Sequence, residues 1–228
     1  MPPHVLSLNV GAREPNGAKG SLPTGIHKTP VAEVMVRAPG PKHGGLGSGL
    51  EGDFIGDPRH HGGDYQAVYA FAREQLDWWE GELGRELPDG AFGENLTTLG
   101  LPVDDAVIGE RWAVGDEVVL EVCGPRIPCA TFRARMGERG WVRRFTEVGL
   151  TGAYLSVVTP GLVRRGDTVQ VVERPGHGVT VPVTFRAFTG DLEAADRVLA
   201  AECLVDVEAA ELRERVANRR RTSTELDA

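Results

Sequence analysis

The sequence predicts a mainly β protein of the α+β class, in which a barrel of short strands precedes a small helical module. Up to about residue 174, short apolar stretches alternate with Gly-Asp and Gly-Pro turns. After Asp191 the composition changes to an alanine-, leucine- and charge-rich segment with helical periodicity. Thirty glycines and fifteen prolines supply the turns that many short strands need.

The first part of the chain predicts two strands, two loops and one helix. The strands are expected at residues 4–11 and 31–39, with a Gly/Pro-rich loop between them and a longer glycine-rich loop at residues 40–64. Residues 66–84 are expected to run from the end of a strand into a helix, with Ala72, Leu76, Trp79 and Leu83 at helical spacing. Core packing is the expected role of the tryptophans in this helix.

The rest of the chain predicts further strands, one helix and a change of domain. Strands are expected within residues 92–129 and 151–175, on either side of a helix at residues 129–149 that is basic on one face. We expect a barrel domain over residues 1–174, a linker plus helical module over residues 175–221, and a disordered tail over residues 222–228. The boundary falls between Arg174 and Asp191, and the helices are expected after it.

The composition excludes several classes of protein. A net charge of −8 and a pI near 5.3 argue against binding to a nucleic-acid polymer or to an anionic membrane surface. The sequence contains neither a long apolar run nor a secretory signal pattern, so we expect a cytoplasmic protein. Three irregularly spaced cysteines fit neither a disulfide framework nor a four-ligand zinc site.

The segment GDPRHHGGDYQAV, residues 56–68, suggests a metal site at first sight. However, neighbouring side chains of an extended segment point to opposite faces, so His60 and His61 are not expected to bind one ion together. Hydrogen bonding to a ligand or to the backbone is the favoured role of these histidines. The glycine pair Gly62 and Gly63 indicates a close approach of two backbone segments or a positive φ.

Cys129 is the main candidate for a reactive group. It follows Pro128 and begins a predicted helix, and Arg126 is close in sequence, so both the helix dipole and a positive charge favour the thiolate. Such a thiolate suits a nucleophile, a persulfide carrier or a ligand of a soft metal, and the residues alone leave a structural role equally open. Cys123, at the end of a strand, is expected to be a small buried side chain.

A second, weaker candidate is the pair Glu94 and Asn95 in the segment FGENLTTLGL, residues 92–101. A carboxylate and an amide side by side can orient a ligand, or they can belong to an ordinary turn.

Together, the segments HHGG, FGENL and PRIPC, in this order, resemble the MOSC domain family, named for the molybdenum cofactor sulfurase C-terminal domain. The resemblance is to its YiiM-like branch, covers about residues 5–173, and extends to the small helical "3-alpha" domain that follows in that branch. It implies a β-barrel related to that of pyruvate kinase. It also implies a molybdenum cofactor (molybdopterin) whose metal binds Cys129, and reduction of N-hydroxylated compounds such as hydroxylaminopurines and amidoximes.

The residue chemistry and the cofactor that the resemblance implies combine into one hypothesis about the candidate residues. Cys129 is expected to bind the metal, and His60 or His61 to supply a proton to the leaving hydroxyl group. The cofactor-binding candidates are Lys28, Arg59, His60, His61, Gly63, Glu94, Asn95 and Arg126. Solvent exposure without a role is an equally good expectation for Lys28 and Arg126.

The expected partners are a small N-hydroxylated substrate and a separate reductase, because the chain has no flavin or iron–sulfur motif. A homodimer also fits the resemblance. Two alternatives stay open: a sulfur carrier with a persulfide on Cys129, and a pterin- or anion-binding domain without catalysis. The glycine-rich loop near residues 39–52 is longer than the resemblance leads us to expect, and a mobile lid is one interpretation of it.

Overall fold

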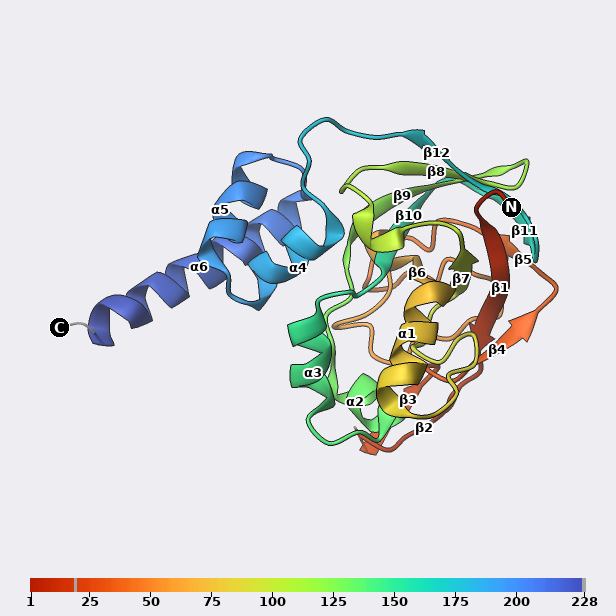
Figure 1. Ribbon diagram of the computed structural model, residues 1–228, viewed down its shortest axis with the longest axis horizontal. Helices are drawn as coiled ribbons and strands as arrows, with labels where there is room; N and C mark the ends of the chain where they lie inside the picture. The colour runs from red at the N-terminus through yellow and green to blue at the C-terminus, as the bar shows by residue number, and fades with distance from the viewer. Residues whose placement is uncertain (19, 227–228) are drawn as a thin grey trace.

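One eight-stranded mixed sheet forms the body of the protein (Figure 1). The structure, a computed structural model, describes residues 1–18 and 20–226. The strand order is β12-β8-β9-β10-β6-β7-β1-β4, and within it only the pair β6 and β7 is parallel. The strands are β1 (His4–Gly11), β4 (Lys28–Val31), β6 (Val68–Ala72), β7 (Leu96–Leu99), β8 (Arg111–Val114), β9 (Val118–Pro125), β10 (Ala153–Thr159) and β12 (Val169–Glu173).

The sheet curls round so that the start of β1, next to the edge strand β4, meets the opposite edge of the sheet at β12. An isolated bridge joins His4, at the start of β1, to Thr168, directly before β12. Backbone hydrogen bonds from Val5 N to Asp167 O and from Val169 N to Pro3 O, each 2.8 Å long, strengthen this contact. The predicted α+β class is therefore confirmed, and the arrangement is consistent with the predicted barrel.

Two two-stranded sheets lie outside the main sheet, and one of them forms where the sequence predicted a loop. Residues 11–30, expected to be a loop, contain β2 (Glu14–Asn16) and β3 (Gly20–Thr24), which pair with each other, and most of β4. The strand predicted at residues 31–39 is shorter, β5 (Glu33–Val36), and it pairs with β11 (Gly161–Arg164). The expectation of a single long loop at residues 11–30 was wrong, because pairing partners elsewhere in the fold order short extended pieces that carry little signal of their own.

Three helices pack through aromatic side chains beside one end of the sheet (Figure 1). They are α1 (Arg73–Leu83), α2 (Ala130–Met136) and α3 (Trp141–Val148). In α1, Trp79 is fully buried as predicted, whereas its neighbour Trp78 is 44% exposed. The single helix predicted at residues 129–149 is two helices, because Gly137 and Gly140 take left-handed conformations between them.

A compact group of three helices ends the chain: α4 (Val181–Thr189), α5 (Leu192–Ala200) and α6 (Asp206–Leu226). The first of these begins ten residues before Asp191, so the expectation of helices only after Asp191 was wrong for α4. Helix α6 continues past residue 222 to Leu226, where a tail was expected, and residues 227–228 lie outside the described residues. The far end of α6 projects away from the body (Figure 1).

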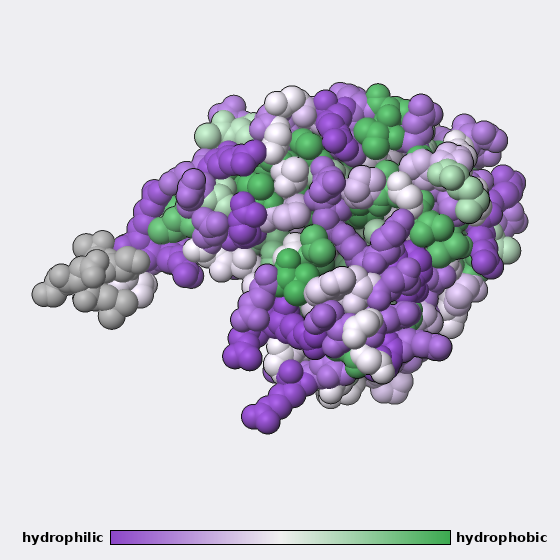
Figure 2. Space-filling view, in the orientation of Figure 1, coloured by the Kyte–Doolittle hydropathy of each residue, from purple (hydrophilic) through white to green (hydrophobic). Residues whose placement is uncertain are grey.

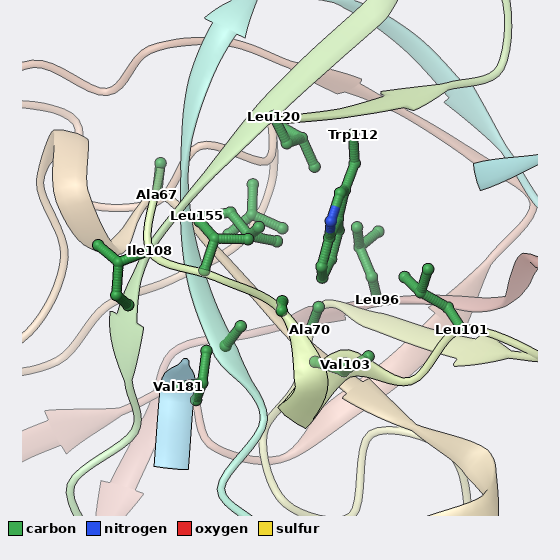
Figure 3. Close-up of a cluster of buried hydrophobic side chains, with 14 of the residues drawn as sticks. Ala67, Ala70, Leu96, Leu101, Val103, Ile108, Trp112, Leu120, Leu155 and Val181 are labelled. Carbon is green, nitrogen blue, oxygen red and sulfur yellow. The ribbon is translucent and has the colours of Figure 1, made fainter. Parts of the chain in front are cut away.

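The helical module shares one hydrophobic core with the sheet. Val181, at the start of α4, lies in the same cluster as Ile108 and Leu155 (Figure 3). Ala194, Val198, Leu212 and Val216 of α5 and α6 belong to the same cluster. The module is thus attached through buried apolar side chains rather than through a linker alone.

The outer surface is mostly hydrophilic, with small scattered apolar patches on the face that Figure 2 shows. Within residues 1–18 and 20–226, no helix has the length and apolar character needed to cross a membrane.

Candidate functional site

Cys129 lies where the segment after β9 turns into α2, as the sequence predicted. Its backbone is extended, with φ −123° and ψ 173°, and it is the N-cap residue of α2. Its side chain lines a pocket enclosed by β6, by the segments at residues 23–28 and 54–62, and by Tyr154 of β10. The pocket has a cavity volume of about 90 Å³.

The surroundings of Cys129 favour the thiolate. Burial raises the pKa of this thiol, but a hydrogen bond with His61 and the positive charge of Arg126 outweigh that effect. A hydrogen bond with the backbone of Phe132, in the first turn of α2, lowers the pKa further. The result is a pKa of about 6 instead of 9.0, so the sulfur is mostly ionised at neutral pH.

Arg126 is a buried cation in the wall of this pocket. It is only 6% exposed, donates a hydrogen bond of 2.6 Å to Phe92 O, and lies over the rings of Phe132 and Tyr69, 3.6 and 5.3 Å from their centroids. Among the residues that the structure describes, no carboxylate forms an ion pair with it. A buried guanidinium that has no carboxylate partner favours the binding of an anion in the pocket. The Cys129 thiolate supplies one negative charge near it.

The two histidines have different surroundings. Residues 57–61 form a turn, in which the N–H groups of His60 and His61 both donate to Asp57 O, at 3.1 and 3.0 Å. His61 lines the pocket and hydrogen-bonds with Cys129, whereas the side chain of His60 faces a neighbouring cleft. The segment is a turn rather than extended, but the prediction that the two side chains do not converge agrees with this arrangement.

The glycine pair after the histidines brings backbone segments together. Gly62 and Gly63 have φ values of 79° and 81°. A Cβ atom on Gly62 would lie 2.7 Å from Gly47 O, and one on Gly63 would lie 2.7 Å from Lys42 N. The glycine-rich loop is therefore folded tightly on itself, and Gly63 shapes the loop without lining the pocket.

Lys28 is neither exposed nor unpaired. Its side chain is 4% exposed, lines the pocket and forms an ion pair with the fully buried Asp53. Asp53 also accepts hydrogen bonds from Ser48 Oγ, at 2.7 Å, and from Asn95 Nδ2, at 3.0 Å. Asn95 accepts a bond of 3.1 Å from Tyr69 N, so it joins β6 to this polar network at the base of the pocket.

Besides His60 and Gly63, two further predicted cofactor-binding residues, Glu94 and Arg59, do not line the pocket. Glu94 is fully buried and accepts hydrogen bonds from Gly90 N, Phe92 N and Thr97 Oγ1, so it holds a turn together. Burial raises the pKa of Glu94 to about 7, despite these hydrogen bonds. Arg59, with 65% of its side chain exposed, pairs with Asp57 at 3.0 Å and lines the neighbouring cleft.

The pocket and the cleft meet at Cys129. Four residues line both cavities: His61, Gln66, Cys129 and Tyr154. The Oε1 atom of Gln66 is buried and has no hydrogen-bond partner among the described residues, so it can accept a hydrogen bond from a ligand. Sequence reasoning missed Gln66, Tyr69, Tyr154 and Asp53, because an isolated polar or aromatic residue gives no signal until the fold places it.

The other thiols are less reactive. Burial raises the pKa of Cys123 to about 12, which agrees with its predicted structural role, and burial also raises the pKa of Cys203. Within the part of the chain that the structure describes, no three His, Cys, Asp or Glu side chains are grouped so that they could hold a metal ion. A metal on Cys129 would therefore need most of its ligands from another molecule.

The fold and the site together define a curled-sheet protein with an acidic thiol at the junction of two cavities. The MOSC domain model matches residues 57–170, half of the chain, and this segment contains His60, His61, Arg126 and Cys129. The chain belongs to the MOSC domain family.

Curated relatives support this assignment. The chain is 33% identical over 206 residues to the uncharacterized protein YflK of Bacillus subtilis, and the match covers 88% of each. It is 31% identical over 135 residues to protein YiiM of Escherichia coli, covering 55% of this chain and 57% of that protein. A match of 34% over 119 residues to a protein named "Reductase" from Gibberella moniliformis covers half of this chain but only 21% of that longer protein.

Solved structures show the same architecture. YiiM from Geobacillus stearothermophilus superposes with a TM-score of 0.72 at 25% identity, over 94% of this chain and all of that one. YiiM from Escherichia coli gives a TM-score of 0.65, also at 25% identity, over 83% of this chain and 88% of that one. The first match includes almost the whole chain, so its coverage reaches the helical module as well as the sheet.

Proposed function

We propose that this protein binds a molybdenum cofactor through Cys129 and reduces N-hydroxylated small molecules. The observation that carries the proposal is the acidic thiol of Cys129 beside the buried Arg126. Among the described residues, no carboxylate forms an ion pair with Arg126. Membership of the MOSC domain family and the relative named "Reductase" support the same class of function.

The donor groups of the pocket suit such a cofactor. A thiolate is a soft ligand, which fits molybdenum, and the other ligands of the metal would come from the dithiolene of the cofactor. Arg126 suits an anionic part of the cofactor, and Gln66 Oε1 suits an N–H donor of the pterin. Lys28 is a weaker candidate because Asp53 already neutralises its charge.

The closed pocket is smaller than this cofactor needs. Its volume of about 90 Å³ is well below the roughly 300 Å³ at which ligand sites begin. We therefore propose that the loop at residues 54–62, which forms one wall, moves outward when the cofactor binds.

When bound, the cofactor supplies the two electrons that break the N–O bond. The overall reaction converts R–NH–OH, two electrons and two protons into R–NH₂ and water, and a separate reductase provides the electrons. His61, at Cys129, is placed to hold a proton for the leaving oxygen, whereas His60 faces only the cleft. Arg126 keeps the thiolate ionised throughout.

Metal analysis tests the proposal. Protein purified from a host that makes the cofactor should contain molybdenum and turn over a benzamidoxime-type substrate with an electron donor. Cys129→Ser should lose both the metal and the turnover, whereas Cys203→Ser, a matched control outside the pocket, should keep them.

A different result would favour one of the alternatives. Absence of molybdenum from the parent protein, or activity that survives in Cys129→Ser, would overturn the proposal. A mass increment of one sulfur atom on the Cys129 peptide would instead identify a sulfur carrier.

A further inference from the structure

The cleft on the other side of Cys129 is large enough for a small molecule. Its volume of about 350 Å³ lies within the range of ordinary ligand sites. Cys129 and His61 are among the residues that line it, so a molecule in this cleft can touch the groups to which the proposed function assigns the chemistry.

The helical module supplies part of the wall. Phe188 of α4 and Glu208 of α6 line the cleft together with Tyr65 and Ile127 of the body. Tyr65 and Ile127 are 45% and 42% exposed, so apolar surface is available on the body side. The cleft therefore has apolar sides suited to a flat ring and an acidic group on the module.

Glu208 is the acid without a partner. Of the charged groups around the cleft, Arg59 pairs with Asp57, and Arg215 pairs with Glu211 at 2.7 Å. Lys42 acts on Glu208 only through its charge, and among the described residues the Glu208 carboxylate forms no hydrogen bond or ion pair.

Burial raises the pKa of Glu208 to about 7, and the charge of Lys42 lowers it only in part. A half-buried carboxyl group in this state gains from a cation or an N–H donor that enters the cleft.

We propose that the cleft binds the substrate and that Glu208 selects molecules with a flat apolar body and a basic, N–H-bearing group. The inference rests on the proposed function for the reacting end of the substrate, whose N-hydroxyl group lies at Cys129 and His61. The basic group lies at the far end, against the helical module. Glu208 is thus a specificity residue, whereas the body of the protein carries the chemistry.

Binding of benzamidine to the metal-free protein tests the inference. Benzamidine is a flat cation, and benzamide is its neutral counterpart of the same shape. Calorimetry should show that Glu208→Gln weakens benzamidine binding on the order of tenfold and leaves benzamide binding unchanged. Glu214→Gln, also on α6 but outside the cleft lining, should bind both as the parent does.

Cys129 locates the bound probe. Benzamidine should slow alkylation of Cys129 by iodoacetamide in the parent and much less in Glu208→Gln. Equal benzamidine affinity in the parent and Glu208→Gln, or no protection of Cys129, would overturn the inference. Because these measurements need no metal, a parent protein without molybdenum would overturn the proposed function and leave this result standing.

Discussion

At the scale of single residues, the acidity of Cys129 depends on groups from three separate parts of the chain. His61 comes from the glycine-rich loop, Arg126 from the end of β9, and the backbone of Phe132 from α2. Arg126 and the helix start are near Cys129 in sequence, so these two effects could be predicted. The contact with His61 joins residues 68 positions apart, and only the folded structure places them together.

Replacement of His61 should make Cys129 less acidic. In His61→Ala the thiolate loses its hydrogen bond with the imidazole, so we expect the thiol pKa to rise from about 6 by roughly one unit or more. The pH at half-maximal alkylation rate, followed on the Cys129 peptide, measures this pKa. His60→Ala is the matched control, and a midpoint that moves equally in both variants would contradict the assignment to His61.

At the same scale, the structure places the predicted cofactor-binding residue Glu94 in the interior. A carboxylate beside an amide in a turn gives the same sequence pattern whether it faces a ligand or the interior. The structure shows that Glu94 binds the backbone of its own turn and that only Asn95 reaches the pocket wall. Which of two neighbours points inward depends on local backbone conformation, and one sequence does not reveal it.

At the scale of elements, strongly periodic segments were predicted well and short or mixed ones poorly. The alternation of apolar and polar residues at 4–11 predicted β1 correctly, and the spacing of Leu76 and Trp79 predicted α1. Helix α4 was missed because its sequence, VPVTFRAFT, is rich in β-branched and aromatic residues that favour strands, and it is helical here through burial against the sheet.

The glycine-rich loop offers a direct test of close packing. Gly62→Ala should destabilise the protein more than Gly52→Ala, although both positions have φ near +79°. At Gly62 the added Cβ would meet another backbone segment, Gly47 O at 2.7 Å, whereas at Gly52 no atom of residues 1–18 or 20–226 outside its chain neighbours lies within 4 Å of it. We expect a loss of about 1 kcal/mol for Gly52→Ala and a further 1–3 kcal/mol, roughly, for Gly62→Ala.

Urea unfolding measures both variants. Equal free energies of unfolding for Gly62→Ala and Gly52→Ala would mean that the backbone near Gly62 shifts easily to make room for the methyl group. The description of the loop as tightly folded would then be wrong.

At the scale of the whole molecule, the sheet and the helical module share one hydrophobic core. Sequence composition placed a domain boundary between them, and composition carries no information about which apolar side chains meet across it. Val181, Val198 and Leu212 of the module are fully buried in the cluster that also contains Leu155 of the sheet.

Both parts should therefore unfold together in urea. All four tryptophans lie between residues 78 and 141 and report on the body, whereas alkylation of Cys203, followed by peptide mass spectrometry, reports on the module. We expect the two unfolding midpoints to coincide. Labelling of Cys203 at clearly lower urea than the fluorescence change would show that the module opens by itself.

The burial of Arg126 has a consequence for the response of the thiol to salt. Dissolved ions screen charges across water, over about 8 Å at physiological ionic strength, but they screen buried charges much less. Arg126 lies over Tyr69 and Phe132 and is almost sealed from solvent. We therefore expect concentrated salt to weaken the attraction between this guanidinium and the sulfur of Cys129 much less than it weakens the ion pairs on the outer surface.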